Sequence, residues 1–181
     1  MLEIARETSY NAEVQLLDLS SFNSVIAFAR RLEGQPIDIY VANAAVASMD
    51  YVETKDGWEQ WCVPTYRSLY DSLTVVGLGR SLQVNHLSTS LLTFLLVPNL
   101  AKAASLHSSS SRVVIVSSGA AFASTFDDEF MKGDFLAKLN DKDLCVPQMM
   151  AHRYPDTKRE CSLFIYISYS SQYLTTYTCQ C

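Results

Sequence analysis

The sequence is poor in glycine, with six in 181 residues, and none of them forms a Gly-x-Gly-x-x-Gly pattern. Such a pattern makes a tight turn between a strand and a helix, where backbone N–H groups can hold a pyrophosphate. Gly77 and Gly79 form the only close pair, and no third glycine follows them at this spacing. The sequence therefore shows no phosphate-binding turn, and we interpret 77–79 as a loop.

Basic clusters and long apolar runs are also absent. The net charge is -5, which gives no electrostatic reason to bind nucleic acid or an anionic membrane. Residues 1–15 carry charges where a signal peptide needs an apolar core. No stretch approaches the roughly 20 apolar residues of a membrane span. We therefore expect no nucleic-acid partner, no membrane span and a cytoplasmic location.

The five cysteines lack the paired spacing of metal ligands. An odd number in an apparently cytosolic chain also argues against a disulfide framework. We predict no metal site; the alternative is a zinc site that draws on Cys179, Cys181 and a histidine.

The composition is that of a globular protein with a real core, because 49% of the residues are hydrophobic and 18% are charged. Apolar runs predict strands at 13–18, 37–45 and 111–118, the last with the continuous Val and Ile of a strand buried on both faces. Helical spacing predicts helices at 21–32, behind a serine cap, and at 82–106. Strands that alternate with helices predict an α/β fold with a parallel, doubly wound sheet.

Tyr154 and Lys158 are four residues apart, a spacing that places two side chains on one face of a helix. An ammonium beside a phenol favours proton transfer from it, but the spacing alone occurs by chance on many helices. Upstream lie, in order, IDIYVANAAVA (37–47), LQVNHLSTSLLT (82–93) and VVIVSSGAA (113–121). Together these segments resemble the short-chain dehydrogenase/reductase family of the classical Ser-Tyr-Lys type. Residues 122–144 further resemble the extended substrate-side loop of its retinol-dehydrogenase-like and fungal secondary-metabolite branches.

The resemblance implies a catalytic set. Tyr154 would donate the proton, and Lys158 would assist it and hydrogen-bond the nicotinamide ribose. Ser118 would orient the substrate carbonyl, and Asn85 would hold a water molecule in the proton relay. From the residues alone, a serine pair at the end of a strand is also a turn signal, and an asparagine in such a helix is also a simple polar contact.

The resemblance also implies binding of NAD(H) or NADP(H). Asp18 matches the aspartate that touches the adenine, although it is as readily explained as a cap of the following helix. Asn43 and Ala44 lie in the sequence Ala-Asn-Ala-Ala (42–45), where the family has a glycine at the position of Ala45. The substrate would be a small carbonyl compound or alcohol. The oligomeric state is left open, with a homo-oligomer as one alternative.

The chain departs from the family pattern in three places. Residues 1–158 would form a partial Rossmann-like domain that lacks the first two strands, the first helix and the last strands. Residues 61–80 interrupt a continuous family segment, and 159–181 form a tail whose Tyr, Ser, Thr and Ile favour strand or aggregation over helix. Our hypothesis is that both segments are translated intron and that the start is misplaced or truncated. The alternatives are a genuine insertion loop and an evolved short variant.

The sequence thus predicts an NAD(P)(H)-dependent oxidoreductase that reduces a carbonyl or oxidises an alcohol, with secondary metabolism as the branch-level setting. Because the glycine-rich turn is missing, we expect little activity from the isolated polypeptide. The alternative is a non-catalytic remnant or interaction protein that keeps half of a Rossmann-like sheet.

Overall fold

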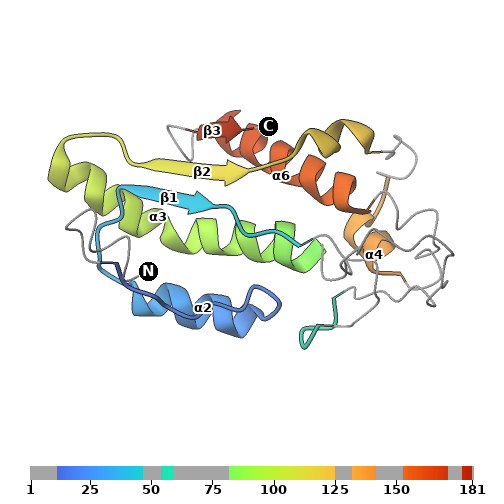
Figure 1. Cartoon of the computed structure of the whole chain (residues 1–181), viewed down its shortest axis with the longest axis horizontal. Coiled ribbons are helices and arrows are strands. Elements are labelled where there is room, and N and C mark those ends of the chain that lie inside the picture. The colour runs from blue at the N-terminus through green and yellow to red at the C-terminus, as the bar shows by residue number, and fades with distance from the viewer. Residues whose placement is uncertain are drawn as a thin grey trace, which may run out of the picture.

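A computed structural model describes residues 12–46, 54–58, 82–124, 132–141, 153–170 and 177–180. Three parallel strands form a sheet in the order β1 (Ile39–Ala42), β2 (Arg112–Val116) and β3 (Tyr177–Gln180). Helix α3 (Ser88–His107) connects β1 to β2, and α6 (Arg153–Ser170) lies between β2 and β3 in the chain (Figure 1). Helix α2 (Phe22–Arg31) precedes β1. This arrangement confirms the predicted partial Rossmann-like α/β fold.

The strand register aligns β2 with β1 on one side and with β3 on the other. Val41 lies opposite Val114, and Val114 lies opposite Thr178 on the other side. Parallel neighbours need a long crossover between them, which α3 and α6 supply. Because the strands are parallel, their carboxyl ends share one edge of the sheet, and the segments that follow β1 and β2 meet there. Ligands of open α/β sheets bind at this edge.

The predicted helix at 21–32 is confirmed as α2. The Ser21 hydroxyl accepts a hydrogen bond from the Ser24 backbone N–H at 3.5 Å and so caps the helix N-terminus. Val25 and Ala29 are buried on the face that meets α3. The helix ends with Arg30 and Arg31, where basic side chains favour the negative end of the helix dipole.

The predicted helix at 82–106 is confirmed as well. It begins with a π-helical turn, η1 (Leu82–Leu87), continues as α3 and ends before Ser108, whose φ of 49° is left-handed. The expectation that no stretch approaches a membrane span needs correction. The span Leu82–His107 is long and apolar enough by length and composition, with a mean hydropathy of 1.3 over its best window. In this fold it is a central helix, with Leu92 and Leu96 buried against α2.

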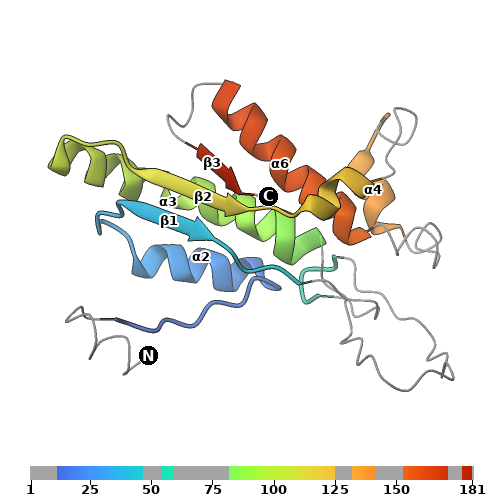
Figure 2. The ribbon, with the colours of Figure 1, turned by 45° about the horizontal axis from the view of Figure 1, so that its top comes forward.

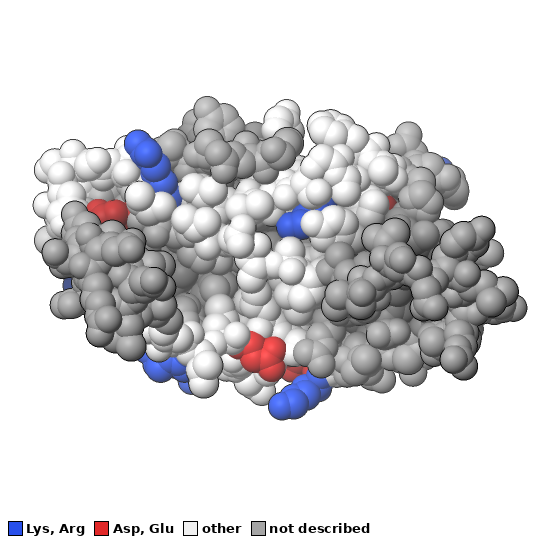
Figure 3. All heavy atoms as spheres, in the orientation of Figure 1, with Lys and Arg blue, Asp and Glu red and all other residues white. Residues whose placement is uncertain are grey.

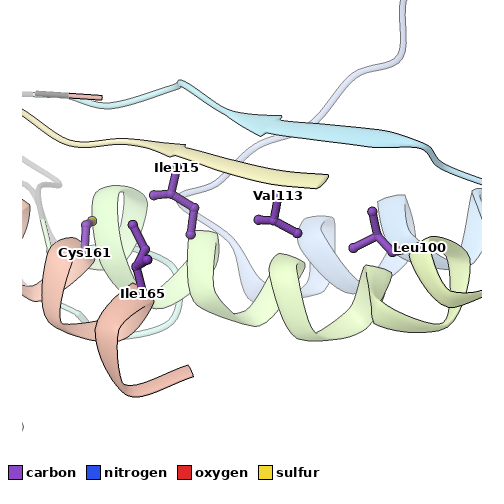
Figure 4. Close-up of a cluster of buried hydrophobic side chains, with 5 residues drawn as sticks. All are labelled: Leu100, Val113, Ile115, Cys161 and Ile165. Atoms are coloured by element: carbon purple, nitrogen blue, oxygen red, sulfur yellow. The ribbon is translucent and has the colours of Figure 1, made fainter. Parts of the chain in front are cut away.

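The described helices cover one side of the sheet. Val113 and Ile115 point from β2 toward α3 and α6, where they contact Leu100, Cys161 and Ile165 (Figure 4). The alternate β2 residues, Val114 and Val116, are only half-buried. The prediction that this strand is buried on both faces is therefore wrong for the described part of the chain, because α2, α3 and α6 all pack on the same side (Figure 2).

Residues 13–18 do not form the predicted strand. They run as irregular chain, with Val14 61% and Leu16 87% exposed. A strand is stabilised by hydrogen bonds to a neighbour, and β1 pairs only with β2 among the described residues. Leu17 and Leu19 instead pack onto the cluster formed by α2 and α3.

The tail departs from its prediction in its first part, which is helical, and agrees with it at 177–180, which is a strand. Residues 159–170 continue α6 as helix, although their composition favours strand, and 177–180 form β3. Cys161 and Ile165 are buried against β2 and α3, so tertiary packing overrides the local preference. The described sheet therefore contains β3, from the tail, and lacks the predicted strand at 13–18.

Candidate active site

Tyr154 and Lys158 lie together in the first turns of α6. Lys158 is only 3% exposed, and its Nζ lies 5.8 Å from the centre of the Tyr154 ring. The same ammonium donates a hydrogen bond to the Val116 carbonyl, at 2.8 Å, at the end of β2. The predicted pair is thus brought to the carboxyl edge of the sheet, with the lysine fixed to the strand that precedes the predicted serine.

The two serines after β2 have different surroundings. Ser117 is buried, and its hydroxyl donates to the Lys158 carbonyl at 3.1 Å and lies 2.9 Å from the Ser162 hydroxyl. Ser118 is half-buried and begins the 3₁₀ helix η2 (Gly119–Ala123), where its hydroxyl accepts from the Ala120 N–H at 3.2 Å. Ser117 therefore holds α6 against the strand, and both serines line a cavity between η2 and α6.

Asn85 connects three parts of the site. Its Oδ1 accepts from the Val46 N–H and its Nδ2 donates to the Val46 carbonyl, both at 2.7 Å. The same Nδ2 donates to the Thr157 hydroxyl at 3.1 Å. The Asn85 backbone carbonyl accepts from the Cys161 thiol at 3.1 Å. Asn85 thus ties the chain that follows β1 to the helix that carries Tyr154, and its water-relay role stays a prediction.

The predicted cofactor residues occupy two places. Asn43 and Ala44 are exposed just after β1 and line a cavity of about 370 Å³ beside α2 and α3. Asp18 lies in the turn before α2, where its Oδ1 accepts from the Ser20 N–H at 2.9 Å and the Ser20 hydroxyl at 2.6 Å. Ser21, rather than Asp18, caps the helix. The structure brings Asn43 and Ala44 to the edge where the catalytic candidates lie, and Asp18 lies between Leu17 and Leu19, which line the same cavity.

Burial shifts the pKa of three groups around the site. It lowers the pKa of His86, next to Asn85, to about 4, and the ring makes an edge contact with Phe164. It raises the pKa of Tyr40 in β1 to about 12, against the smaller opposite effect of a hydrogen bond with Thr93. It also raises the pKa of the Glu160 carboxyl, which the charge of Arg159 only partly offsets. His86 is therefore neutral at physiological pH.

Three further polar residues hold the site and were not predicted. The Ser124 hydroxyl, after η2, donates to Asp156 Oδ1 at 2.8 Å, and the Thr157 hydroxyl donates to the Tyr154 carbonyl at 3.0 Å. Asp156 and Thr157 are both buried. Asp156 and Thr157 lie in the segment Tyr-Pro-Asp-Thr-Lys, between the predicted tyrosine and lysine. A polar residue at such a position does not by itself indicate a buried hydrogen-bond partner.

Several sequence predictions lie outside the described residues. They include the insert 61–80 with its glycine pair at 77 and 79, and the parts 125–131 and 142–144 of the predicted substrate-side loop. Within the described part of the chain, no group of three His, Cys, Asp or Glu side chains could hold a metal ion.

The solved structures that resemble this chain have the same fold. An NADH-dependent reductase A1-R′ responsible for alginate metabolism superposes with a TM-score of 0.57 and 16% identity, over 98% of this chain and 57% of that one. An alcohol dehydrogenase from Thermococcus sibiricus superposes with a TM-score of 0.56 and 14% identity, over the same 98% and 57%. The fold is therefore Rossmann-like.

Curated proteins give the family. The short chain dehydrogenase sol3 of Alternaria solani is 33% identical over 138 residues, which cover 75% of this chain and 41% of that protein. A polyprenol dehydrogenase of Mus musculus is 36% identical over 113 residues, or 61% of this chain and 28% of that protein. No protein-family model matches the sequence. The chain belongs to the short-chain dehydrogenase/reductase family, and it spans less than half the length of these relatives.

Proposed function

We propose that this chain carries the catalytic residues of an NAD(P)(H)-dependent oxidoreductase, which reduces a carbonyl or oxidises an alcohol on a small organic substrate. The observation that supports the proposal best is the position of Lys158. Its ammonium is buried, fixed to the end of β2 and 5.8 Å from the Tyr154 ring, so the cation and the phenol stay together. A role in secondary metabolism and a cytoplasmic location are part of the same proposal.

The donors present fit the nicotinamide end of such a cofactor. Lys158 supplies an ammonium for ribose hydroxyls, and Asn43 and Ala44 stand at the mouth of a cavity at the same edge of the sheet. The bound cofactor would supply or accept a hydride at the substrate carbon. Tyr154 would donate its phenolic proton to the oxygen of a carbonyl that is being reduced, or take that proton back from an alcohol.

The remaining residues would prepare this proton transfer. Ser118 would donate a hydrogen bond to the substrate oxygen from the start of η2, where its hydroxyl lines the cavity. Asn85 and Thr157 would hold the tyrosine helix in place through the hydrogen bond between them. The buried ammonium of Lys158 would stay beside the phenol from which the proton leaves.

Substitution of Tyr154 by phenylalanine tests the proposal. Carbonyl reduction, followed as NADPH consumption with a panel of aryl aldehydes and ketones, should fall by about 10²- to 10⁴-fold, because the phenolic proton is lost. Tyr166→Phe is the matched control, since Tyr166 lies on the same helix and is 70% exposed. Equal rates in the wild type and Tyr154→Phe would contradict the assignment.

A second candidate function is that of an interaction protein which forms a homo-oligomer through the sheet. Strand β1 is an edge strand among the described elements, and Ile39 and Val41 on it are 58% and 54% exposed. The face in Figure 3 shows few charged side chains on its described surface. Uncharged edges of this kind favour pairing with another strand. Self-association that Val41→Lys abolishes, in a protein without turnover, would favour this candidate.

A further inference from the structure

A cavity of about 610 Å³ lies between η2 and α6, next to the proposed reaction centre. Its wall on the η2 side includes Ser118 and Phe122, and Phe122 is 87% exposed. The α6 side contributes Arg159, Ser162 and Leu163. The cavity therefore combines an apolar wall, several hydroxyl groups and one guanidinium, and it contains the serine proposed to orient the substrate.

Among the described lining residues of this cavity, Arg159 is the one with a charged side chain. A guanidinium presents a planar fork of N–H donors that matches the two oxygens of a carboxylate. Glu160 and Asp156 are nearby on the same helix, since the charges of Arg159 and Asp156 both act on the Glu160 carboxyl. These acids reduce the positive potential around Arg159. A ligand with one negative charge is therefore favoured over a phosphate dianion.

We propose that Arg159 selects substrates that carry a carboxylate, so that the protein acts on oxo acids or hydroxy acids with an apolar body. The carboxylate binds the guanidinium, the apolar body lies against Phe122 and Leu163, and the reacting oxygen reaches Ser118. This inference rests on the proposed function, because it places the carbonyl at the serine of the same cavity. The carboxylate gives the substrate a second point of contact. Two contacts fix the orientation of the substrate, which a single hydroxyl contact does not.

The test compares 4-oxo-4-phenylbutanoate with its neutral amide, which has the same shape. Binding of each compound to the full 181-residue chain is measured by calorimetry without cofactor. The wild type should bind the acid about tenfold or more tightly than the amide, since hydrogen bonds to charged groups exceed neutral ones by this order. Equal affinities for the two compounds would overturn the proposal, and this measurement needs no variant.

Variants identify the residue. Arg159→Met should remove the preference for the acid, and Arg159→Lys should keep part of it, because it retains the charge and loses the fork. Phe122→Ala should weaken the acid and the amide by the same factor. Arg112→Met is the matched control, since Arg112 is exposed at the start of β2, away from the cavity. A folded Arg159→Met variant that still prefers the acid would overturn the assignment.

Turnover of the same two compounds with NADPH separates this inference from the proposed function. A preference in binding without reduction of either compound would overturn the proposed reaction and leave the carboxylate site standing. Reduction of both compounds at equal kcat/KM, with equal affinities, would overturn the carboxylate site alone.

Discussion

Asn85→Ala should destabilise the protein far more than the loss of one exposed amide would. The side chain is 2% exposed and makes three hydrogen bonds, two with Val46 and one with Thr157. Each hydrogen bond contributes about 1 kcal/mol, and truncation of the side chain leaves the polar groups of Val46 and Thr157 without their partner. We therefore expect the free energy of unfolding to fall by about 3 kcal/mol.

Urea denaturation followed by circular dichroism measures this change. Asn140→Ala is the matched control, because its side chain makes one exposed hydrogen bond, to the Gly57 carbonyl. Its expected cost is about 0.5 kcal/mol. Asn85→Asp keeps the shape of the side chain but replaces the donor to the Val46 carbonyl with a carboxylate oxygen. It should be at least as destabilising as the alanine variant at neutral pH.

The outcome also separates two roles of Asn85. If the residue acts only by holding α6, rescue of stability by an osmolyte should restore activity to Asn85→Ala together with its fold. If a relay water on this residue matters as well, kcat should stay low in the refolded variant. Equal unfolding free energies for Asn85→Ala and Asn140→Ala would refute the structural argument itself.

Two further predictions concern stability. Burial lowers the pKa of His86 to about 4, so the unfolded chain takes up a proton near its ordinary value of 6.5 before the folded chain does. The free energy of unfolding should therefore fall as the pH drops from about 6.5 to about 4, by up to about 3 kcal/mol. His86→Gln should flatten this dependence in denaturation curves. Ile115→Ala, in the buried contact of β2 with α6, should cost about 3 kcal/mol, and Val41→Ala on the exposed face of β1 less than about 1 kcal/mol, by the same measurement. A similar loss for both substitutions would contradict the one-sided packing of the sheet.

Local sequence signals predicted an element where residues within it or next to it determine its structure. Ser21 marks the start of α2, and Ser108 follows the end of α3 in a conformation that stops a helix. The Val and Ile of 113–116 form β2, since β-branched side chains suit a pleated, half-buried surface. These features depend on neighbours a few residues away.

The sequence proposed the residues of the candidate site but did not indicate their contacts. The motif order indicated Asn85, Ser118, Tyr154 and Lys158, and the structure places them on three elements that meet at one edge of the sheet. The hydrogen bonds from Asn85 to Val46, and from Ser124 to Asp156, join residues that lie 39 and 32 positions apart. No local pattern specifies such pairs.

The sequence by itself determined the class of fold, the family and the identity of the candidate residues, because these follow from periodicity and from motifs in a fixed order. Only the tertiary structure decided the secondary structure of 13–18 and 159–170. The first has the composition of a strand, but no described strand pairs with it, and its Leu16 is exposed. The second favours strand locally, yet forms a helix because Cys161 and Ile165 can then be buried against β2 and α3. Pairing and burial depend on what lies nearby in space, which the order of residues along the chain does not state.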